Sequence, residues 1–262
     1  MRPTDPPIRA PAVPRERPAP EPRISLADRR VLIVGVGGLG SPAALSLARV
    51  GVGTLGLVDG DVVDASNLHR QVIYRAVDIG RRKVAAAAQR LQDLHPTLRI
   101  ESFDEWLEPT TAADLFRGFD FVVDGTDRIA SKFVVNDAAV LAGVAYSHAG
   151  VVGFQGQTLT VIPRQSACLR CLFPTPPPDG DVATCQEAGI IGSLAASIAI
   201  VQATEAVRVL LGLGSYLANR MLTYDGSTGR WRAVALRRNP ACPLCGVNPI
   251  IQIVEPAPDT GR

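Results

Sequence analysis

Short apolar runs alternate with longer, partly apolar segments in the first part of the chain. Runs of four or five residues rich in Val, Ile and Leu are typical of strands buried on both faces, and the segments between them predict helices. The predicted strands cover 31–34, 54–58, 99–103, 119–123 and 144–147, and the predicted helices cover 41–50, 84–94 and 131–141. This alternation predicts an α/β fold with a Rossmann-like, doubly wound and mainly parallel sheet.

The second half of the chain has a different pattern. Residues 157–162, 221–224 and 231–236 have strand-like patterns, and 190–211 is a long segment rich in small and apolar residues. Its uncharged stretch, 188–204, is shorter than the roughly 20 residues needed to span a bilayer, so we expect a buried helix and no membrane partner. Because this helix is apolar around most of its circumference, we predict that a homodimer covers part of it.

Composition narrows the classes of function. The chain has 262 residues, 47% of them hydrophobic, which is enough to bury a substantial core. Its net charge of +2 is too small to indicate binding to nucleic acid or to an anionic membrane. The first residues lack the charged and apolar regions of a secretory signal. Four of the five cysteines form two C-x-x-C pairs, which suits a reducing compartment, so we expect a cytoplasmic protein that holds a metal.

Glycines follow the first predicted strand at the spacing of a nucleotide-binding turn. Gly35, Gly37 and Gly40 form G-x-G-x-x-G between the strand and a helix. The first allows a tight turn, the second lets backbone N–H groups approach a phosphate, and the third lets the helix pack closely on the sheet. An ordinary strand–turn–helix fits the motif too. Asp59 ends the second strand, where it is either a ribose-binding carboxylate or a solvated turn residue.

Charged residues after the second strand indicate the class of nucleotide. Arg70 can form paired hydrogen bonds with phosphate oxygens, Lys83 can act as a point charge, and Asp127 can bind Mg²⁺. A nicotinamide dehydrogenase needs no such set, and no G-x-x-x-x-G-K-[ST] motif is present. Each basic residue alone fits a solvated helix face equally well. Their joint order after Asp59 predicts a site for phosphates, Mg²⁺ and a ribose.

The two cysteine pairs predict a zinc site. Cys168, Cys171, Cys242 and Cys245 can supply four thiolates to a tetrahedral Zn²⁺, and an all-cysteine set indicates a structural site. The alternative is two unrelated buried or redox-active pairs. A thioredoxin-like motif is disfavoured because neither pair directly follows a βαβ strand.

Taken in order, these motifs resemble the ThiF/MoeB/HesA family, the bacterial relatives of ubiquitin-activating enzymes. The resemblance covers roughly residues 25–248. It rests on the two cysteine pairs and on Gly35-x-Gly37-Gly38-Leu39-Gly40, Asp59-x-Asp61, Asn67-Leu68-x-Arg70-Gln71, Lys83, Asp124-Gly125-Thr126-Asp127, Thr184-Cys185-Gln186-Glu187-Ala188-Gly189 and Gln202-Ala203-Thr204-Glu205-Ala206.

The resemblance implies that ATP and Mg²⁺ are used to adenylate the C-terminal glycine carboxylate of a ubiquitin-like sulfur-carrier protein ending in Gly-Gly. Pyrophosphate would be released, in a molybdopterin- or thiamine-type pathway, and a separate protein would donate the sulfur. The implied nucleotide contacts are Gly35, Gly37, Gly38, Gly40, Asp59, Asp61, Asn67, Arg70, Lys83 and Asp127.

The family also implies individual roles. Asp59 would bind the ribose, and Asn67, Arg70 and Lys83 would contact phosphates. Asp127 would bind Mg²⁺ near the attacking carboxylate. The catalytic residues would be Arg70, Lys83 and Asp127. The fifth cysteine, Cys185, either accepts the activated carrier covalently or is a small residue that fills space. No role is assigned to the histidines at 69, 95 and 148.

The chain departs from the family pattern at two places. The arginine arm common before the first strand is replaced by a proline-rich segment, so the resemblance does not extend to an arginine that acts on the partner subunit's nucleotide. Arg128 and Lys132 stand where Asn and Arg are usual. Two alternatives therefore stay open: adenylation of another C-terminal carboxylate, as in tRNA modification or peptide natural-product synthesis, and a zinc-stabilised binding module without catalysis.

These predictions divide the chain into four segments. They are a disordered proline-rich arm (1–24), a nucleotide-binding Rossmann-like half (25–150), a zinc-bearing, carrier-binding half of the same domain (151–248) and a tail (249–262).

Overall fold

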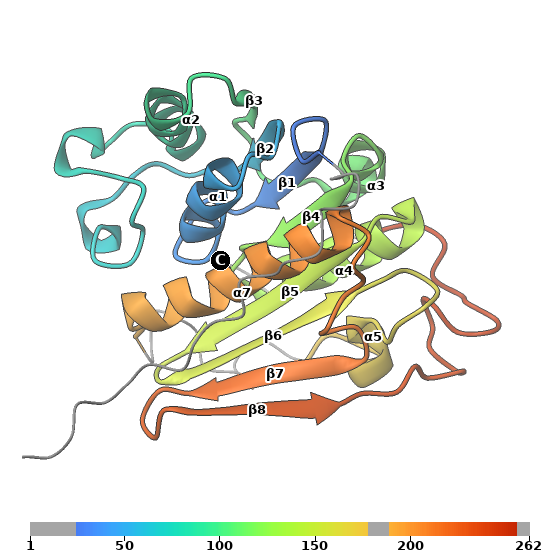
Figure 1. Cartoon of the computed structure of the whole chain (residues 1–262). Helices are drawn as coiled ribbons and strands as arrows, with labels where there is room; N and C mark the ends of the chain where they lie inside the picture. The colour runs from blue at the N-terminus through green and yellow to red at the C-terminus, as the bar shows by residue number, and fades with distance from the viewer. Residues whose placement is uncertain (1–24, 178–188, 256–262) are drawn as a thin grey trace, which may run out of the picture.

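One mixed sheet forms the centre of the computed structural model, which describes residues 25–177 and 189–255 (Figure 1). Its strands lie in the order β3-β2-β1-β4-β5-β6-β7-β8. The parallel part consists of β1 (Arg30–Val34), β2 (Thr54–Val58), β3 (Arg99–Phe103), β4 (Phe121–Asp124) and β5 (Tyr146–Val152). The antiparallel part adds β6 (Gln155–Val161), β7 (Arg220–Asp225) and β8 (Arg230–Ala235). The prediction of a mainly parallel α/β sheet is confirmed.

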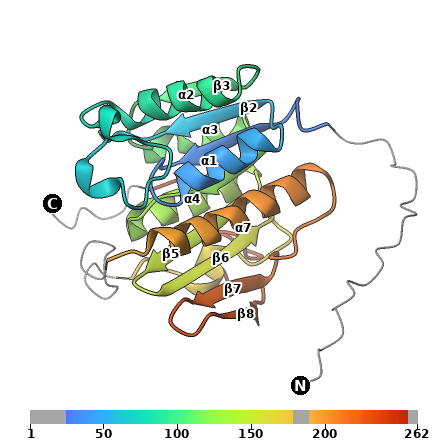
Figure 2. The same ribbon diagram turned by 60° about the vertical axis from the view of Figure 1, so that its left-hand side comes forward.

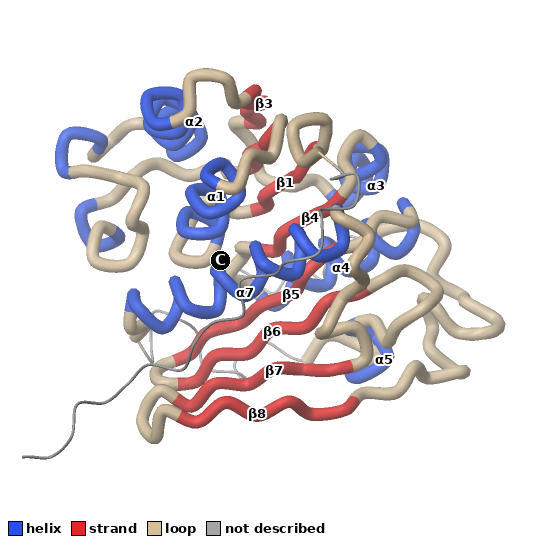
Figure 3. Tube along the Cα trace, in the orientation of Figure 1, coloured by secondary structure: helices blue, strands red, loops and turns tan. Residues whose placement is uncertain are grey.

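Helices cover both faces of the sheet (Figure 1). One layer contains α1 (Gly40–Arg49), α2 (Lys83–Leu94) and α7 (Gly192–Leu210). The other contains α3 (Pro109–Arg117), α4 (Ile129–Ala142) and the short α5 (Leu169–Leu172). Two 3₁₀ turns, η1 (Ala65–Asn67) and η2 (Ala76–Asp78), lie between β2 and α2. Figure 3 shows the strands in red and the loops that join them in tan.

The central strands are apolar at every position because they are buried on both sides. In β1, Val31 and Ile33 belong to the core under α1, α2 and α7, whereas Leu32 and Val34 belong to the core under α3 and α4. Successive side chains of a strand point to opposite faces, so one continuous apolar run supplies two cores.

Helix α7 lies along β5 and β6 and beside α1 (Figure 2). By length and composition it is apolar enough to cross a membrane, but its inner face is buried on the sheet. Its polar side chains are bonded there: the Gln202 amide donates to the carbonyls of Asp124 and Ser147, each at 3.0 Å. The Glu205 carboxylate accepts hydrogen bonds from the Thr160 hydroxyl and the Leu217 N–H. The predicted packing helix is therefore a core helix.

Helix α3 and strand β5 differ from the sequence prediction. Helix α3 was not predicted, because only Ala112 and Phe116 of its nine residues are buried and its apolar pattern is correspondingly sparse. Strand β5 runs to Val152, five residues beyond the predicted end, because it pairs with β6 along its whole length.

Candidate functional site

Three glycines bring the first turn of the sheet into close contact with the fourth strand. Gly35 has a φ of +83°, and a Cβ there would lie 2.9 Å from the carbonyl of Gly125. A Cβ on Gly40 would lie 1.9 Å from the carbonyl oxygen of Gly35. Only glycine permits this packing, which holds the start of α1 against the carboxyl ends of β1 and β4.

The turn presents free backbone donors at the start of α1. Within the described residues, the N–H groups of Gly38 and Leu39 have no hydrogen-bond partner. They precede a helix of ten residues, whose N-terminus carries a partial positive charge. Unpaired N–H groups at such a position are suited to an anion, such as a phosphate.

Asp59 lies beside this turn at the end of β2, and it is buried. Its Oδ2 accepts a hydrogen bond from Val36 N at 2.7 Å, and its Oδ1 accepts one from Asp61 N at 3.0 Å. Burial raises the pKa of the Asp59 carboxyl, against the opposing effects of Lys83 and the two N–H groups. Each oxygen retains acceptor capacity, so the carboxylate can also accept hydrogen bonds from the hydroxyls of a ribose.

Lys83 is the first residue of α2 and is almost fully buried. Its Nζ lies 2.7 Å from Oδ2 of Asp61, and its backbone N–H donates to the Asp61 carbonyl at 3.0 Å. These contacts hold the ammonium beside the two carboxylates that follow β2. Because the Asp61 side chain is half exposed, a phosphate can approach the Lys83 ammonium from the solvent side of this pair.

The segment 67–71 covers the glycine turn. The aliphatic part of Arg70 lies over Gly38, where a Cβ would be 3.7 Å from Cγ and Cδ, and Gln71 lies over Gly37 at the same distance. Gln71 Nε2 donates to Asn67 Oδ1 at 2.7 Å. Among the described residues, the Arg70 guanidinium contacts the Ser66 carbonyl at 3.1 Å and His69 at 3.4 Å and forms no ion pair, so it can receive an anion.

A charged cluster lies under the carboxyl end of β4. Asp124 is fully buried, and its Oδ2 lies 3.0 Å from His148 Nδ1 and 3.4 Å from Lys132 Nζ. The ammonium also donates to the carbonyls of Thr126 and Ala149, each at 2.6 Å. Burial opposes ionisation of Asp124, yet Lys132 and His148 together lower its pKa. Asp127, three residues on, is exposed and has no ion-pair partner within the described residues.

The four paired cysteines converge on the side of the sheet that α4 covers. Their Sγ atoms all lie within 4.8 Å of one another, and four of these separations fall between 3.4 and 3.9 Å. Zn²⁺ with bonds of about 2.3 Å holds sulfurs about 3.8 Å apart. Hydrogen bonds with Cys171 and Cys245, together with burial, raise the pKa of the Cys168 thiol. The set therefore fits a structural zinc site.

Backbone and side-chain contacts hold this cysteine cluster in place. Backbone N–H groups of Asn239 and Cys245 point to the sulfurs of Cys171 and Cys242, as in zinc knuckles. A Cβ on Gly246 would lie 2.5 Å from the Cys242 carbonyl oxygen, so only glycine fits the second turn. The cluster is thus built from two segments about 70 residues apart.

Comparison with known proteins assigns the chain to a family. A model described as the ThiF family matches residues 19–244. The chain belongs to the ThiF family. It is 42% identical over 235 residues to a sulfur carrier protein adenylyltransferase of Thermus thermophilus, which covers 88% of this chain and 87% of the relative. It is 39% identical over 227 residues to a SAMP-activating enzyme E1 of Haloferax volcanii, covering 87% of this chain and 84% of the relative.

Longer relatives and solved structures extend the comparison. The chain is 42% identical over 222 residues to a probable adenylyltransferase/sulfurtransferase MoeZ of Mycobacterium tuberculosis, of which it spans only 57%, against 83% of this chain. The crystal structure of E. coli MccB with ATP has a TM-score of 0.75 and 20% sequence identity over 84% of this chain and 68% of that one. At this identity the likeness concerns the ThiF-like fold alone.

The ThiF motifs found in the sequence gather at one edge of the sheet. Parallel strands end at the same edge, so the glycine turn, Asp59, Lys83, Arg70 and Asp127 share it. The two cysteine pairs also meet, as predicted. Cys185 and the proline-rich arm lie outside the described residues.

The positions of His148 and Lys132 were not predicted. His148 was assigned no role, and Lys132 was noted only as a departure from the family pattern. Both side chains point into the fold toward Asp124. This arrangement depends on the pairing of β4 with β5, which brings His148 beside Asp124 and cannot be derived from the spacing of residues in the sequence.

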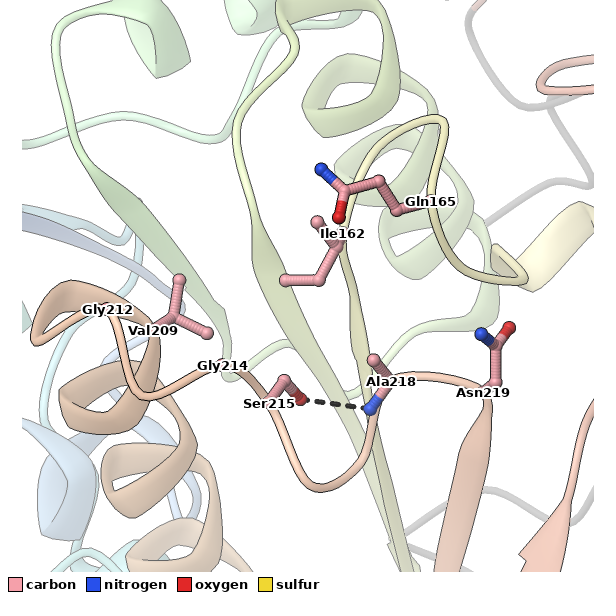
Figure 4. A pocket seen from close by; sticks show the side chains of 8 residues that line it. All are labelled: Ile162, Gln165, Val209, Gly212, Gly214, Ser215, Ala218 and Asn219. Atoms are coloured by element: carbon pink, nitrogen blue, oxygen red, sulfur yellow. Dashed lines mark hydrogen bonds between the residues drawn. The ribbon is translucent and has the colours of Figure 1, made fainter.

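A pocket of about 370 Å³ lies away from the glycine turn (Figure 4). Its lining includes Ile162, Val209 and Ser215, at the end of β6 and of α7. Because β6 runs antiparallel to β5, this end of the sheet is opposite to the edge that carries the ThiF motifs. The pocket is therefore separate from the glycine turn.

Proposed function

We propose that this chain adenylates the C-terminal glycine carboxylate of a ubiquitin-like sulfur-carrier protein, with ATP as the donor. The observation that carries the proposal is the convergence of unpaired N–H groups, a buried carboxylate, Lys83, Arg70 and Asp127 at one edge of a ThiF-family fold. The names of the relatives support a sulfur carrier as the partner.

The residues present fit ATP. We assign the ribose to Asp59 and the phosphates to the α1 N-terminus, Asn67, Arg70 and Lys83. Asp127 is an exposed carboxylate that would hold Mg²⁺, the ion that neutralises phosphate charge when bound. The free N–H groups and the uncommitted Arg70 guanidinium are the features that a triphosphate would satisfy.

The reaction is a displacement at phosphorus. A carrier carboxylate oxygen forms a bond to the α-phosphorus, and the bond from that phosphorus to the bridging oxygen of the β-phosphate breaks. The electron pair leaves with pyrophosphate, so no proton transfer is needed. Arg70 and Lys83 stabilise the charge that develops on the departing phosphates, while Asp59 and the glycine turn hold the nucleotide in line.

The remaining features belong to the same proposal. The protein works as a homodimer in the cytoplasm, where thiols stay reduced. Zinc on the four paired cysteines is structural. A separate protein donates sulfur. After adenylation, the Cys185 thiolate attacks the carbonyl carbon of the carrier's acyl-adenylate, a thioester forms, the bond to the phosphate oxygen breaks and AMP leaves.

Exchange of radioactive pyrophosphate into ATP, with a carrier ending in Gly-Gly, tests this function. Wild-type protein is expected to catalyse it. Asp127→Ala is expected to abolish exchange, and Arg70→Ala to lower its rate by about 100-fold or more, because each removes charge control at the reacting phosphates. Cys185→Ala is expected to leave exchange intact, because thiol attack follows adenylation.

Asp114→Ala is the matched control, because Asp114 is an exposed aspartate on α3. It should exchange at the wild-type rate. Absence of exchange with every Gly-Gly carrier, but exchange with a different peptide carboxylate, would instead support the alternative substrate. Absence of ATP binding altogether would support a binding module.

A further inference from the structure

Trp106 stands beside the ribose-binding carboxylate of the proposed site. Strands β2 and β3 pair in parallel with Val58 opposite Phe103, and Asp59 N donates to the Phe103 carbonyl at 3.3 Å. The segments that follow, 59–61 and 104–106, therefore leave the sheet side by side. The loop after β3 thus brings an aromatic side chain to the edge that carries the glycine turn.

The indole lies face-on against the backbone next to Asp59. A Cβ on Gly60 would lie 2.8 Å from Cδ2 and 2.9 Å from both Cδ1 and Cε2 of Trp106. Nearly equal distances to three atoms of the pyrrole ring mean that the ring plane faces Gly60. Any other residue at position 60 would displace it, so Gly60 is the residue that allows the ring to sit there.

The loop that carries Trp106 is held on both sides. Arg82 Nε donates to both carboxylate oxygens of Asp104, at 2.6 and 2.8 Å. Phe103 and Leu107 pack against the core under α3 and α4. Trp106 itself is 60% exposed, whereas Phe103 is partly buried and Phe119 is buried. One face of the indole is packed on Gly60, and its other surface is open to solvent.

We propose that Trp106 is the residue against which the purine base of the nucleotide stacks. The inference deepens the proposed function and rests on it. Because Gly60 directly follows Asp59, a base whose ribose binds to Asp59 would come close to Trp106, and the fixed, solvent-facing indole provides a flat apolar surface there. Stacking of a base on an aromatic side chain is worth about a tenfold or greater gain in affinity.

Stacking acts on the ground state and the transition state alike, because the base does not take part in the reaction. Trp106→Ala is therefore expected to raise the KM for ATP about tenfold and to leave kcat almost unchanged. Trp106→Phe keeps an aromatic face and is expected to restore most of the affinity.

Fluorescence gives a readout that does not depend on activity. The chain has two tryptophans. Trp231 in β8 stacks on Tyr224 in β7, and β8 is the edge strand farthest from β3, the strand that Trp106 follows. In Trp231→Phe, adenosine and ATP are expected to quench the emission of Trp106, whereas tripolyphosphate, which has no base, is not. In Trp106→Phe, where Trp231 remains, none of the three should change the emission.

Calorimetric titration of wild-type protein with ATP separates the possible failures. If ATP binds but the Trp106 emission does not respond, or Trp106→Ala binds ATP as tightly as wild type, the stacking role is wrong while the proposed function stands. If wild-type protein binds no ATP, both are wrong. Quenching by tripolyphosphate equal to that by ATP would also overturn stacking, because it would show that Trp106 senses phosphate alone.

Discussion

At the scale of single residues, the charged cluster beneath β4 accounts for how an exposed aspartate is held in position. Lys132 donates to the carbonyl of Thr126, the residue before Asp127, and to that of Ala149 in β5. The Thr126 N–H and hydroxyl in turn donate to Asp124 Oδ1. The turn that carries Asp127 is thus fixed to two strands. This also restricts the position of Asp127, the proposed Mg²⁺ ligand.

The same cluster predicts a loss of stability in mild acid. Burial lowers the pKa of His148 below its ordinary 6.5, in spite of the neighbouring Asp124. As the pH falls below 6.5 the unfolded chain binds a proton at this histidine while the folded protein does not, so stability falls. The Asp124 contribution is lost only below its ordinary pKa of 3.8, and the two pH ranges are separate.

Urea unfolding at a series of pH values between 6.5 and 5 measures this effect. One proton corresponds to a slope of up to about 1.4 kcal/mol per pH unit. His148→Asn keeps a donor for Asp124 but does not titrate, so its slope should be smaller than that of wild type by up to that amount. Equal slopes in the two proteins would show that His148 takes up no extra proton on unfolding.

The site residues that could be predicted from the sequence alone are those that belong to motifs with a recognisable spacing. The glycine turn, Asp59 and the cysteine pairs follow from spacing along one or two elements. The contacts of Lys132 and His148 depend on the pairing of β4 with β5, which spacing does not encode. Trp106 acquires its position from the pairing of β2 with β3, so it too was missed.

At the scale of elements, the cysteine cluster connects α4 with the segment 242–245. Arg170, between two cysteines, forms paired hydrogen bonds with Asp137 of α4 and stacks on Phe133 at 5.1 Å. Leu169 N donates to Asn136 Oδ1 at 2.8 Å. A zinc ion on the four cysteines would therefore join residues 242–245 to a helix that packs on the parallel sheet.

We expect about one Zn²⁺ per chain, bound only by sulfur. Cys242→Ser should lose the metal and lower the thermal midpoint by about 10 °C, because losing a structural metal costs several kcal/mol. Metal analysis and calorimetry measure the two effects. Limited proteolysis should then cut near residues 236–255 before it cuts the glycine turn.

Two comparisons test this interpretation. Ser166→Ala, which removes a nearby hydroxyl but no thiol, should retain the full zinc content. Freshly purified, reduced wild-type protein without zinc would contradict the assignment. It would leave two unlinked cysteine pairs as the correct interpretation.

At the scale of the whole molecule, the sequence predicted the alternation of strands and helices but not the single continuous sheet. The strands after β5 do not form a layer of their own, because β6 pairs with β5 along seven residues and extends the parallel strands directly. Helix α7 then returns to lie beside α1, so both halves share one core. Such long-range pairings require tertiary contacts that no local pattern specifies.

The homodimer prediction can be tested at the outward face of α7. The helix is less apolar on this face than the sequence suggested: the exposed stripe consists of Ser193, Ser197, Ile200 and Thr204. The Ser197 and Thr204 hydroxyls each donate to the carbonyl four residues earlier, at 2.8 Å. Their donors are already bonded, so the stripe presents small side chains and one isoleucine to a symmetry-related copy.

Light scattering at micromolar concentration is expected to give about twice the chain mass of 27.7 kDa. Ile200, 46% exposed at the middle of the stripe, would lie in the interface, so Ile200→Asp should place an unpaired charge there and give monomers. Val77→Asp is the control, because Val77 is 76% exposed on η2 and its replacement should leave the dimer intact. A wild-type mass near 27.7 kDa would contradict the dimer itself, whereas a dimeric Ile200→Asp protein would mean that the two copies meet through another surface.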